Sequence, residues 1–157
     1  MITLDSRLAY SHNGQKIMFT SPTNPFVVDT RAEVALLSRN IVIEGVRGDA
    51  TGLGGDVKIA GQNTRVSIEW CEFRLLGRRG HLGRYPLHLH DVGGTPYIAN
   101  VAVHESYQRG IVLHCTSNAR VVDSVVAGVY GFAFMLEDGA EEDNILSGNL
   151  AMDINNA

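Results

Sequence analysis

The sequence is poor in cysteine, in long apolar runs and in positive charge. Two cysteines in 157 residues are too few for the disulfide framework of a small secreted scaffold. The longest uncharged apolar stretch, residues 125–136, is shorter than the roughly 20 residues that cross a bilayer. The first residues lack the basic and apolar regions of a signal peptide. A net charge of −4 argues against a nucleic-acid partner. From the charge and from the shortness of the apolar stretch, we expect neither nucleic-acid binding nor membrane insertion.

Helical periodicity is missing as well, and short apolar segments recur instead. No window shows the 3.6-residue apolar period of an amphipathic helix. One family of segments begins at residues 68, 98, 121 and 145, and a second begins at residues 87, 111 and 134. Most steps are therefore 23 or 24 residues, and a loop inserted at residues 77–83 explains the longer first step. This period is too short for a propeller blade and predicts a β-solenoid.

The repeat predicts an all-β fold, a right-handed parallel β-helix of about five coils with two strands in each coil. It would occupy residues 31–157. Residues 1–30 do not fit the repeat and are expected to form a short β-rich lead-in. No cap is evident after the last repeat, so we expect the β-helix to be truncated or covered at that end.

Polar side chains of the second family of segments are expected to form a column on the outer face. Side chains alternate along a strand, so His88 and His90 point outward while the leucines beside them point inward. Stacking then places His90, His114 and Glu137 on successive rungs about 5 Å apart. The expected inner residues are Leu87, Leu89, Ile111, Leu113, Phe134 and Leu136.

The column offers two kinds of chemistry. The candidate metal ligands, for a divalent ion, are His88, His90, His114 and Glu137. Without a metal, the same four residues and Asp138 supply a general base near neutral pH and a general acid. The structural alternative is a row of solvated polar residues on an outer face.

Arginines near the column are candidates for binding acidic sugars. Arg84 and Arg109 lie before equivalent strands, and their guanidinium groups pair well with uronate carboxylates. With the neighbouring Tyr85 they form the predicted substrate-binding set. The remaining charged residues are given structural roles: Arg78 and Arg79 are expected to form a solvated loop, His104 to lie at a turn or on the surface, and Glu72 to have no catalytic partner.

Three stretches resemble one known family. Residues 82–90, 103–109 and 134–139 are similar to the β-helix region of the cell-migration-inducing and hyaluronan-binding protein family, which includes transmembrane protein 2 and the fibrocystins. Residues 29–41 resemble the family's junction between its G8 domain and the β-helix, so residues 1–30 would be a remnant of a G8-type domain. The resemblance implies an extracellular location and, in some members, hyaluronan depolymerisation by a glycosidase or lyase.

Three hypotheses follow for function. The leading one is a carbohydrate-active β-helix that binds and cleaves an acidic, hyaluronan-like polysaccharide at the histidine column. The second is a non-catalytic β-helix used as a spacer or adhesion module. The third, suggested by the two nearby histidines with a later carboxylate, is a metal-dependent enzyme acting on a small molecule.

Overall fold

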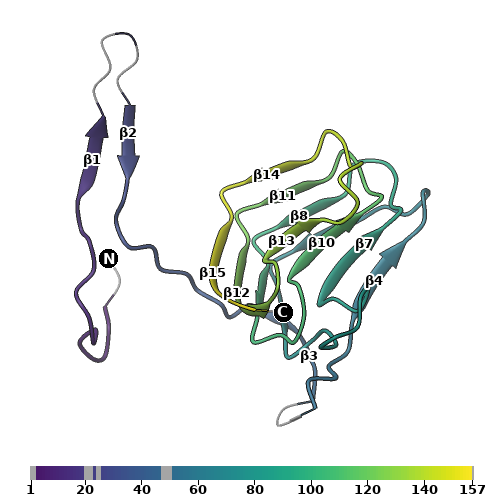
Figure 1. Cartoon of the computed structure of the whole chain (residues 1–157), viewed down its shortest axis with the longest axis horizontal. Helices are drawn as coiled ribbons and strands as arrows, with labels where there is room; N and C mark the ends of the chain where they lie inside the picture. Colours follow the sequence, from purple (N-terminus) through teal and green to yellow (C-terminus); the bar gives the residue numbers. More distant parts are fainter. Residues whose placement is uncertain (1–2, 20–22, 24–25, 47–50, 157) are drawn as a thin grey trace. The chain divides into compact units, whose positions relative to one another are not determined.

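The structure, a computed structural model, describes residues 3–19, 23, 26–46 and 51–156 (Figure 1). The chain divides into two compact units, Met1–Ala35 and Leu36–Ala157. The first unit contains an antiparallel hairpin of β1 (Lys16–Phe19) and β2 (Phe26–Asp29). The boundary expected from the sequence, between residues 30 and 31, lies a few residues before the end of this unit. The assignment of residues 1–30 as a G8 remnant stays a prediction.

The second unit is built from short strands that are parallel to their neighbours. Its strands are β3 (Ile41–Glu44), β4 (Val57–Ala60), β5 (Ser67–Glu69), β6 (Cys71–Arg74), β7 (Leu87–His90), β8 (Tyr97–Ala99), β9 (Ala102–His104), β10 (Ile111–His114), β11 (Arg120–Val122), β12 (Val125–Tyr130), β13 (Phe134–Leu136), β14 (Ile145–Ser147) and β15 (Leu150–Asn155). The described part of the chain contains no helix long and apolar enough to cross a membrane.

The strands form three parallel sheets. The histidine sheet has the order β13-β10-β7-β4, the second sheet β14-β11-β8-β5, and the third sheet β15-β12-β9-β6-β3. Consecutive strands belong to different sheets and the sheets recur in the same order, so the chain winds around one core (Figure 1). The all-β, stacked parallel architecture expected of a β-helix is therefore confirmed.

The expectation of two strands per coil was wrong, because each segment of the first family is two strands joined at a corner. The corner residues Trp70, Asn100, Asp123 and Gly148 all have positive φ, between 48° and 67°. A single residue in the left-handed region turns the chain sharply without a loop. The corners also stack: the N–H of Asn100 donates to Val122 O of the next rung at 3.1 Å. An apolar run that continues through such a corner reads as one strand in the sequence.

The inner face of the histidine sheet forms much of the core. Leu87 pairs with Ile111 and Leu89 with Leu113, and all four side chains are at most 2% exposed. Burying each such side chain contributes about 1.5–3 kcal/mol. On β13, the last strand of this sheet, Leu136 is 39% exposed. The predicted inward alternation therefore holds on β7 and β10 and fixes which side chains face outward.

Candidate functional site

The outward side chains of the histidine sheet come together as a cluster of three imidazoles. His90 is paired with His114 in the register of β7 and β10, and their ring centroids are 4.5 Å apart. The His88 ring lies 5.5 Å from that of His90 and 5.8 Å from that of His114. Glu137 follows β13, and its N–H donates to Leu113 O at 2.9 Å, which continues the column by one rung.

Glu137 is held by a buried phenol and faces two imidazoles. The Tyr85 hydroxyl donates to Glu137 Oε1 at 2.5 Å and accepts a hydrogen bond of 2.8 Å from Arg109 Nη1. Glu137 Oε2 lies 3.5 Å from His114 Nδ1 and 4.0 Å from His88 Nε2. Burial, helped by the bond to Glu137, raises the pKa of Tyr85, so the phenol stays protonated and remains a donor.

His88 is placed as a neutral imidazole with a fixed tautomer. It is 1% exposed, and its Nδ1 lies 3.1 Å from Gly83 O. Since a carbonyl oxygen only accepts, Nδ1 carries the proton and Nε2 keeps its lone pair. Burial lowers the pKa of His88 despite this hydrogen bond, and Lys58 acts in the same direction.

The third imidazole is oriented by the exposed carboxylate Asp138. His114 Nε2 lies 2.9 Å from Asp138 Oδ2, and the Cys115 thiol donates to the same oxygen at 3.2 Å. With a proton on Nε2, the Nδ1 lone pair of His114 points to the side of Glu137. The hydrogen bond to Asp138, followed by desolvation, raises the pKa of Cys115.

The three imidazoles are the residues that could hold a divalent metal ion. The three imidazoles offer ligand atoms that lie within 4.8 Å of one another. His88 Nε2, His90 Nδ1 and Glu137 Oε2 are buried and have no hydrogen-bond partner. Ligands bound tetrahedrally at about 2.1 Å are about 3.4 Å apart, close to the separations of 3.5 and 4.0 Å measured to Glu137 Oε2. A three-histidine, one-carboxylate set suits zinc and similar transition metals.

The structure separates the residues of the predicted substrate-binding set. Arg84 is exposed and pairs with Asp56 at 3.3 Å. Arg109 instead joins the cluster, with Nη1 3.8 Å from Glu137 Oε1. Tyr85 is 0% exposed, so its ring is out of reach of a surface ligand and its hydroxyl serves to hold Glu137.

Sequence reasoning missed a second buried charged group, on the third sheet. His104 was expected at a turn or on the surface, but it is 6% exposed and its Nε2 lies 3.1 Å from Glu72 Oε1. Burial opposes ionisation of Glu72, yet hydrogen bonds from the Arg39 N–H and from His104, with the charge of Arg74, lower its pKa. Applying the two-residue alternation to β6 and β9 would have placed both side chains on one face.

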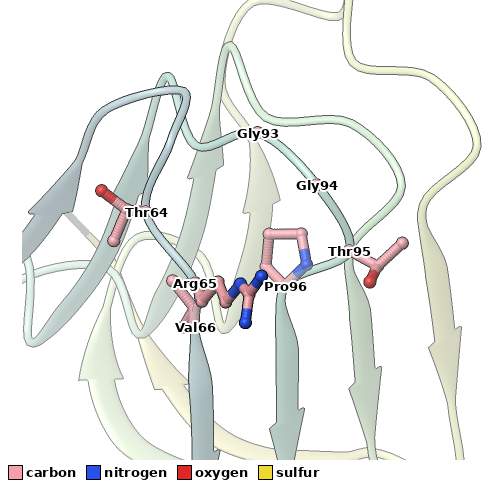
Figure 2. A pocket seen from close by; sticks show the side chains of 7 residues that line it. All are labelled: Thr64, Arg65, Val66, Gly93, Gly94, Thr95 and Pro96. Carbon is pink, nitrogen blue, oxygen red and sulfur yellow. The ribbon is translucent and has the colours of Figure 1, made fainter.

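A hollow elsewhere on this unit lacks the chemistry of the cluster. It has a volume of about 280 Å³ and lies between two neighbouring turns, Thr64–Val66 and Gly93–Pro96 (Figure 2). Its lining contains a single charged residue, Arg65, and no histidine or carboxylate. It therefore offers no acid–base pair and no metal ligands.

Comparison with known proteins identifies the family. A sequence model described as CEMIP beta-helix matches residues 52–157. The chain belongs to the CEMIP β-helix family. The matched CEMIP region contains all of the imidazole cluster, with Tyr85, Arg109, Glu137 and Asp138.

Several curated proteins are similar to this CEMIP β-helix. A G8 domain-containing protein of Dictyostelium discoideum is 38% identical over 88% of this chain and 13% of its own length. The cell surface hyaluronidase of Danio rerio is 35% identical over 80% of this chain and 11% of its length. Human Fibrocystin-L is 30% identical over 96% of this chain and 4% of its length. The chain thus spans a small fraction of each relative, and no solved structure matches it.

Proposed function

We propose that this β-helix binds an acidic polysaccharide of the hyaluronan type and cleaves it at the imidazole cluster, with a divalent metal ion bound there. The observation that carries the proposal is the cluster of His88, His90 and His114, whose ligand atoms lie within 4.8 Å of one another, with Glu137 Oε2 3.5 Å from His114 Nδ1 and 4.0 Å from His88 Nε2. His88 Nε2, His90 Nδ1 and Glu137 Oε2 are buried without hydrogen-bond partners, which is costly, and a bound metal ion would give the imidazole nitrogens a partner. Similarity to proteins named cell surface hyaluronidase supports the substrate class and a location outside the cell.

The residues of the site take distinct roles in this proposal. His88, His90, His114 and Glu137 hold the ion, which when bound supplies a Lewis acid beside the substrate. Asp138, whose side chain is 45% exposed, exchanges a proton with the glycosidic oxygen. Arg109 and Arg84 pair with uronate carboxylates. Hydrolysis adds water across the broken C–O bond, whereas elimination leaves an unsaturated uronate without consuming water.

The first test measures metal and cleavage in the same samples. Metal content of the 157-residue chain is determined by mass spectrometry, and the size of hyaluronan is followed on gels with and without a chelator. We expect about one ion per chain, and loss of metal and of cleavage together under chelation. Ultraviolet absorbance of the products then separates elimination, which creates a conjugated double bond, from hydrolysis.

Variants connect that result to the cluster. His90→Ala and Glu137→Gln remove one ligand each and should reduce the turnover rate at least roughly a hundredfold. His12→Ala, an exposed histidine of the first unit, is the matched control and should behave as the parent. If the double variant His90→Ala/Glu137→Gln turned over every acidic glycan at the parent rate, the proposed mechanism would be wrong.

A non-catalytic role is the second candidate, and one comparison favours it. Human Fibrocystin-L aligns with 96% of this chain, and its name states no enzymatic activity. Under this alternative the β-helix binds glycan without forming product, and binding does not depend on His90 or Glu137. Binding that persists in both variants, with no cleavage by the parent chain, would support this alternative.

A further inference from the structure

A second hollow lies beside the imidazole cluster and shares Arg109 with it. It encloses about 170 Å³ and is lined by Arg79, Gly80, Leu82, Tyr107, Gln108, Arg109 and Tyr130. Arg109 reaches from this lining to Tyr85 Oη at 2.8 Å and lies 3.8 Å from Glu137 Oε1. A ligand seated in the hollow would therefore be one side chain away from the carboxylate of the cluster.

Two guanidinium groups at the hollow lie over aromatic rings. The Arg79 guanidinium lies over the Tyr130 ring, 4.7 Å from its centroid. The Arg109 guanidinium lies over the Tyr85 ring and over the Phe132 ring, 5.5 Å from each centroid. A guanidinium that lies over a ring can still donate hydrogen bonds from its edge. Arg109 already donates to Tyr85 Oη through Nη1. Arg79 has no ion pair with a carboxylate in the described residues, so its charge is available to a ligand.

The rest of the lining is suited to the apolar face of a sugar ring. Tyr107 and Tyr130 present aromatic surface, and the rim includes Leu82, which is 73% exposed. Phe132, next to Arg109, is 52% exposed. Partly exposed aromatic and apolar side chains beside the Arg79 guanidinium match a ring that carries both C–H groups and a carboxylate.

The wall of the hollow is fixed before any ligand arrives. Gln108 Nε2 donates to the carbonyls of Arg78 and His81 at 3.3 Å, tying the loop down. Gly77 has φ of 82°, and a Cβ there would meet Gln108 Cβ at 2.8 Å, so the loop and Gln108 fit closely. A preformed wall lowers the entropy lost on binding.

We propose that this hollow is a subsite for one uronate residue of the acidic polysaccharide, with Arg79 and Arg109 pairing with its carboxylate and Tyr107 and Tyr130 packing on its ring. The volume is below the roughly 300–1,000 Å³ of a pocket for a drug-sized ligand, which limits it to a single sugar unit. The inference rests on the proposed function, because it places the neighbouring glycosidic bond at Glu137 and Asp138.

The test compares acidic and neutral oligosaccharides by calorimetry on the full 157-residue chain. The probes are a short hyaluronan oligosaccharide and a chitin oligosaccharide of equal length. Arg79→Gln and Tyr130→Ala should each weaken binding of the acidic probe roughly tenfold or more while leaving metal content unchanged. Arg79→Lys keeps the charge but loses the planar fork, so its affinity should lie between those of the parent and Arg79→Gln.

Arg65→Gln is the matched control, since it removes an arginine from the hollow of Figure 2. It should bind the acidic probe within about twofold of the parent. The subsite would be overturned if Arg79→Gln and Tyr130→Ala bound the acidic probe with the affinity of the parent. It would also be overturned if Arg65→Gln lost as much affinity for this probe as Arg79→Gln does. Arg79-dependent binding without any cleavage would keep the subsite and reject the catalytic proposal, so the two failures are distinguishable.

Discussion

At the scale of single residues, Asp138 is an exposed carboxylate in contact with an imidazole of the cluster. Its Oδ2 receives the Cys115 thiol at 3.2 Å and lies 2.9 Å from His114 Nε2. Cys115 is exposed and free, so its reactivity reports on the charge of Asp138 without any substrate.

This contact predicts a change in thiol reactivity. In a Cys71→Ser background, Asp138→Asn removes the negative charge that raises the pKa of Cys115, so the thiolate fraction increases. We expect thiol alkylation at mildly alkaline pH to become roughly severalfold faster, measured with an excess of maleimide and with chelator present. Glu142→Gln, which neutralises an exposed carboxylate elsewhere, should leave the rate unchanged; equal rates in both variants would contradict the contact.

At the scale of the strand, the column depends on close approach between neighbouring rungs. Gly110, which precedes β10, receives the Leu87 N–H on its carbonyl and donates its own N–H to Phe132 O. A Cβ at this position would meet Ala133 O and Val126 Cγ1, both at 2.5 Å. The rung that carries His114 therefore has no room for a side chain at Gly110, the residue just before β10.

Gly110→Ala should accordingly destabilise the β-helix. We expect the free energy of unfolding to fall by about 1–3 kcal/mol, because backbone on one side and a core valine on the other must move. Urea denaturation followed by circular dichroism measures the change. Gly55→Ala, whose Cβ would meet only Leu76 Cδ2 at 3.5 Å, is the control and should be neutral or stabilising by up to about 1 kcal/mol. A neutral Gly110→Ala would show that the rungs can separate.

Strand alternation explains how much of the site was predictable from sequence. Inward Leu87 and Leu89 fix His88 and His90 outward, and a constant step between segments aligns His114 and Glu137 with them. The corners were not predictable, since Trp70 in the left-handed region has no local signal of the kind that Gly148 provides. The contacts of Tyr85 were not predictable either, because nothing in the local pattern shows that its hydroxyl bridges Glu137 and Arg109. The right-handed winding and the count of about five coils stay predictions.

At the scale of the whole β-helix unit, the buried Glu72 ties together parts of the chain far apart in sequence. Its Oε2 accepts from the Arg39 N–H at 2.9 Å, and its Oε1 lies 3.1 Å from His104 Nε2 and 3.0 Å from Arg74 Nη1. Arg39 Nε also donates to Asn100 O at 2.6 Å, so the segment that leads into β3 is fastened to the third sheet.

This network predicts an acid-sensitive stability. The pKa of Glu72 is lower in the folded protein than its ordinary value of 4.5, so the stabilisation is full above that pH and is lost as pH falls through the folded pKa. Glu72→Gln should lower the free energy of unfolding by about 3 kcal/mol at neutral pH and flatten its dependence on pH in the acid range. The measurement is urea denaturation repeated from neutral pH downward.

Glu69→Gln provides the matched control for this prediction, because Glu69 is exposed on β5 and its carboxylate accepts a hydrogen bond from the neighbouring Ser67 hydroxyl. It should change the free energy of unfolding by less than about 0.5 kcal/mol at any pH. An acid transition that stayed as steep in Glu72→Gln as in the parent would assign the effect to other carboxylates.

The register of the histidine sheet has a consequence for how such a site evolves. Ala60, His90, His114 and Glu137 occupy equivalent positions of four successive rungs, and the exposed Ala60 stands next to His90 in the β4–β7 pairing. At this position each rung contributes one outward side chain. A single substitution can therefore add, remove or exchange one ligand while the backbone and the core leucines stay in place. The outer face of such a β-helix can thus change its chemistry rung by rung while its core stays the same.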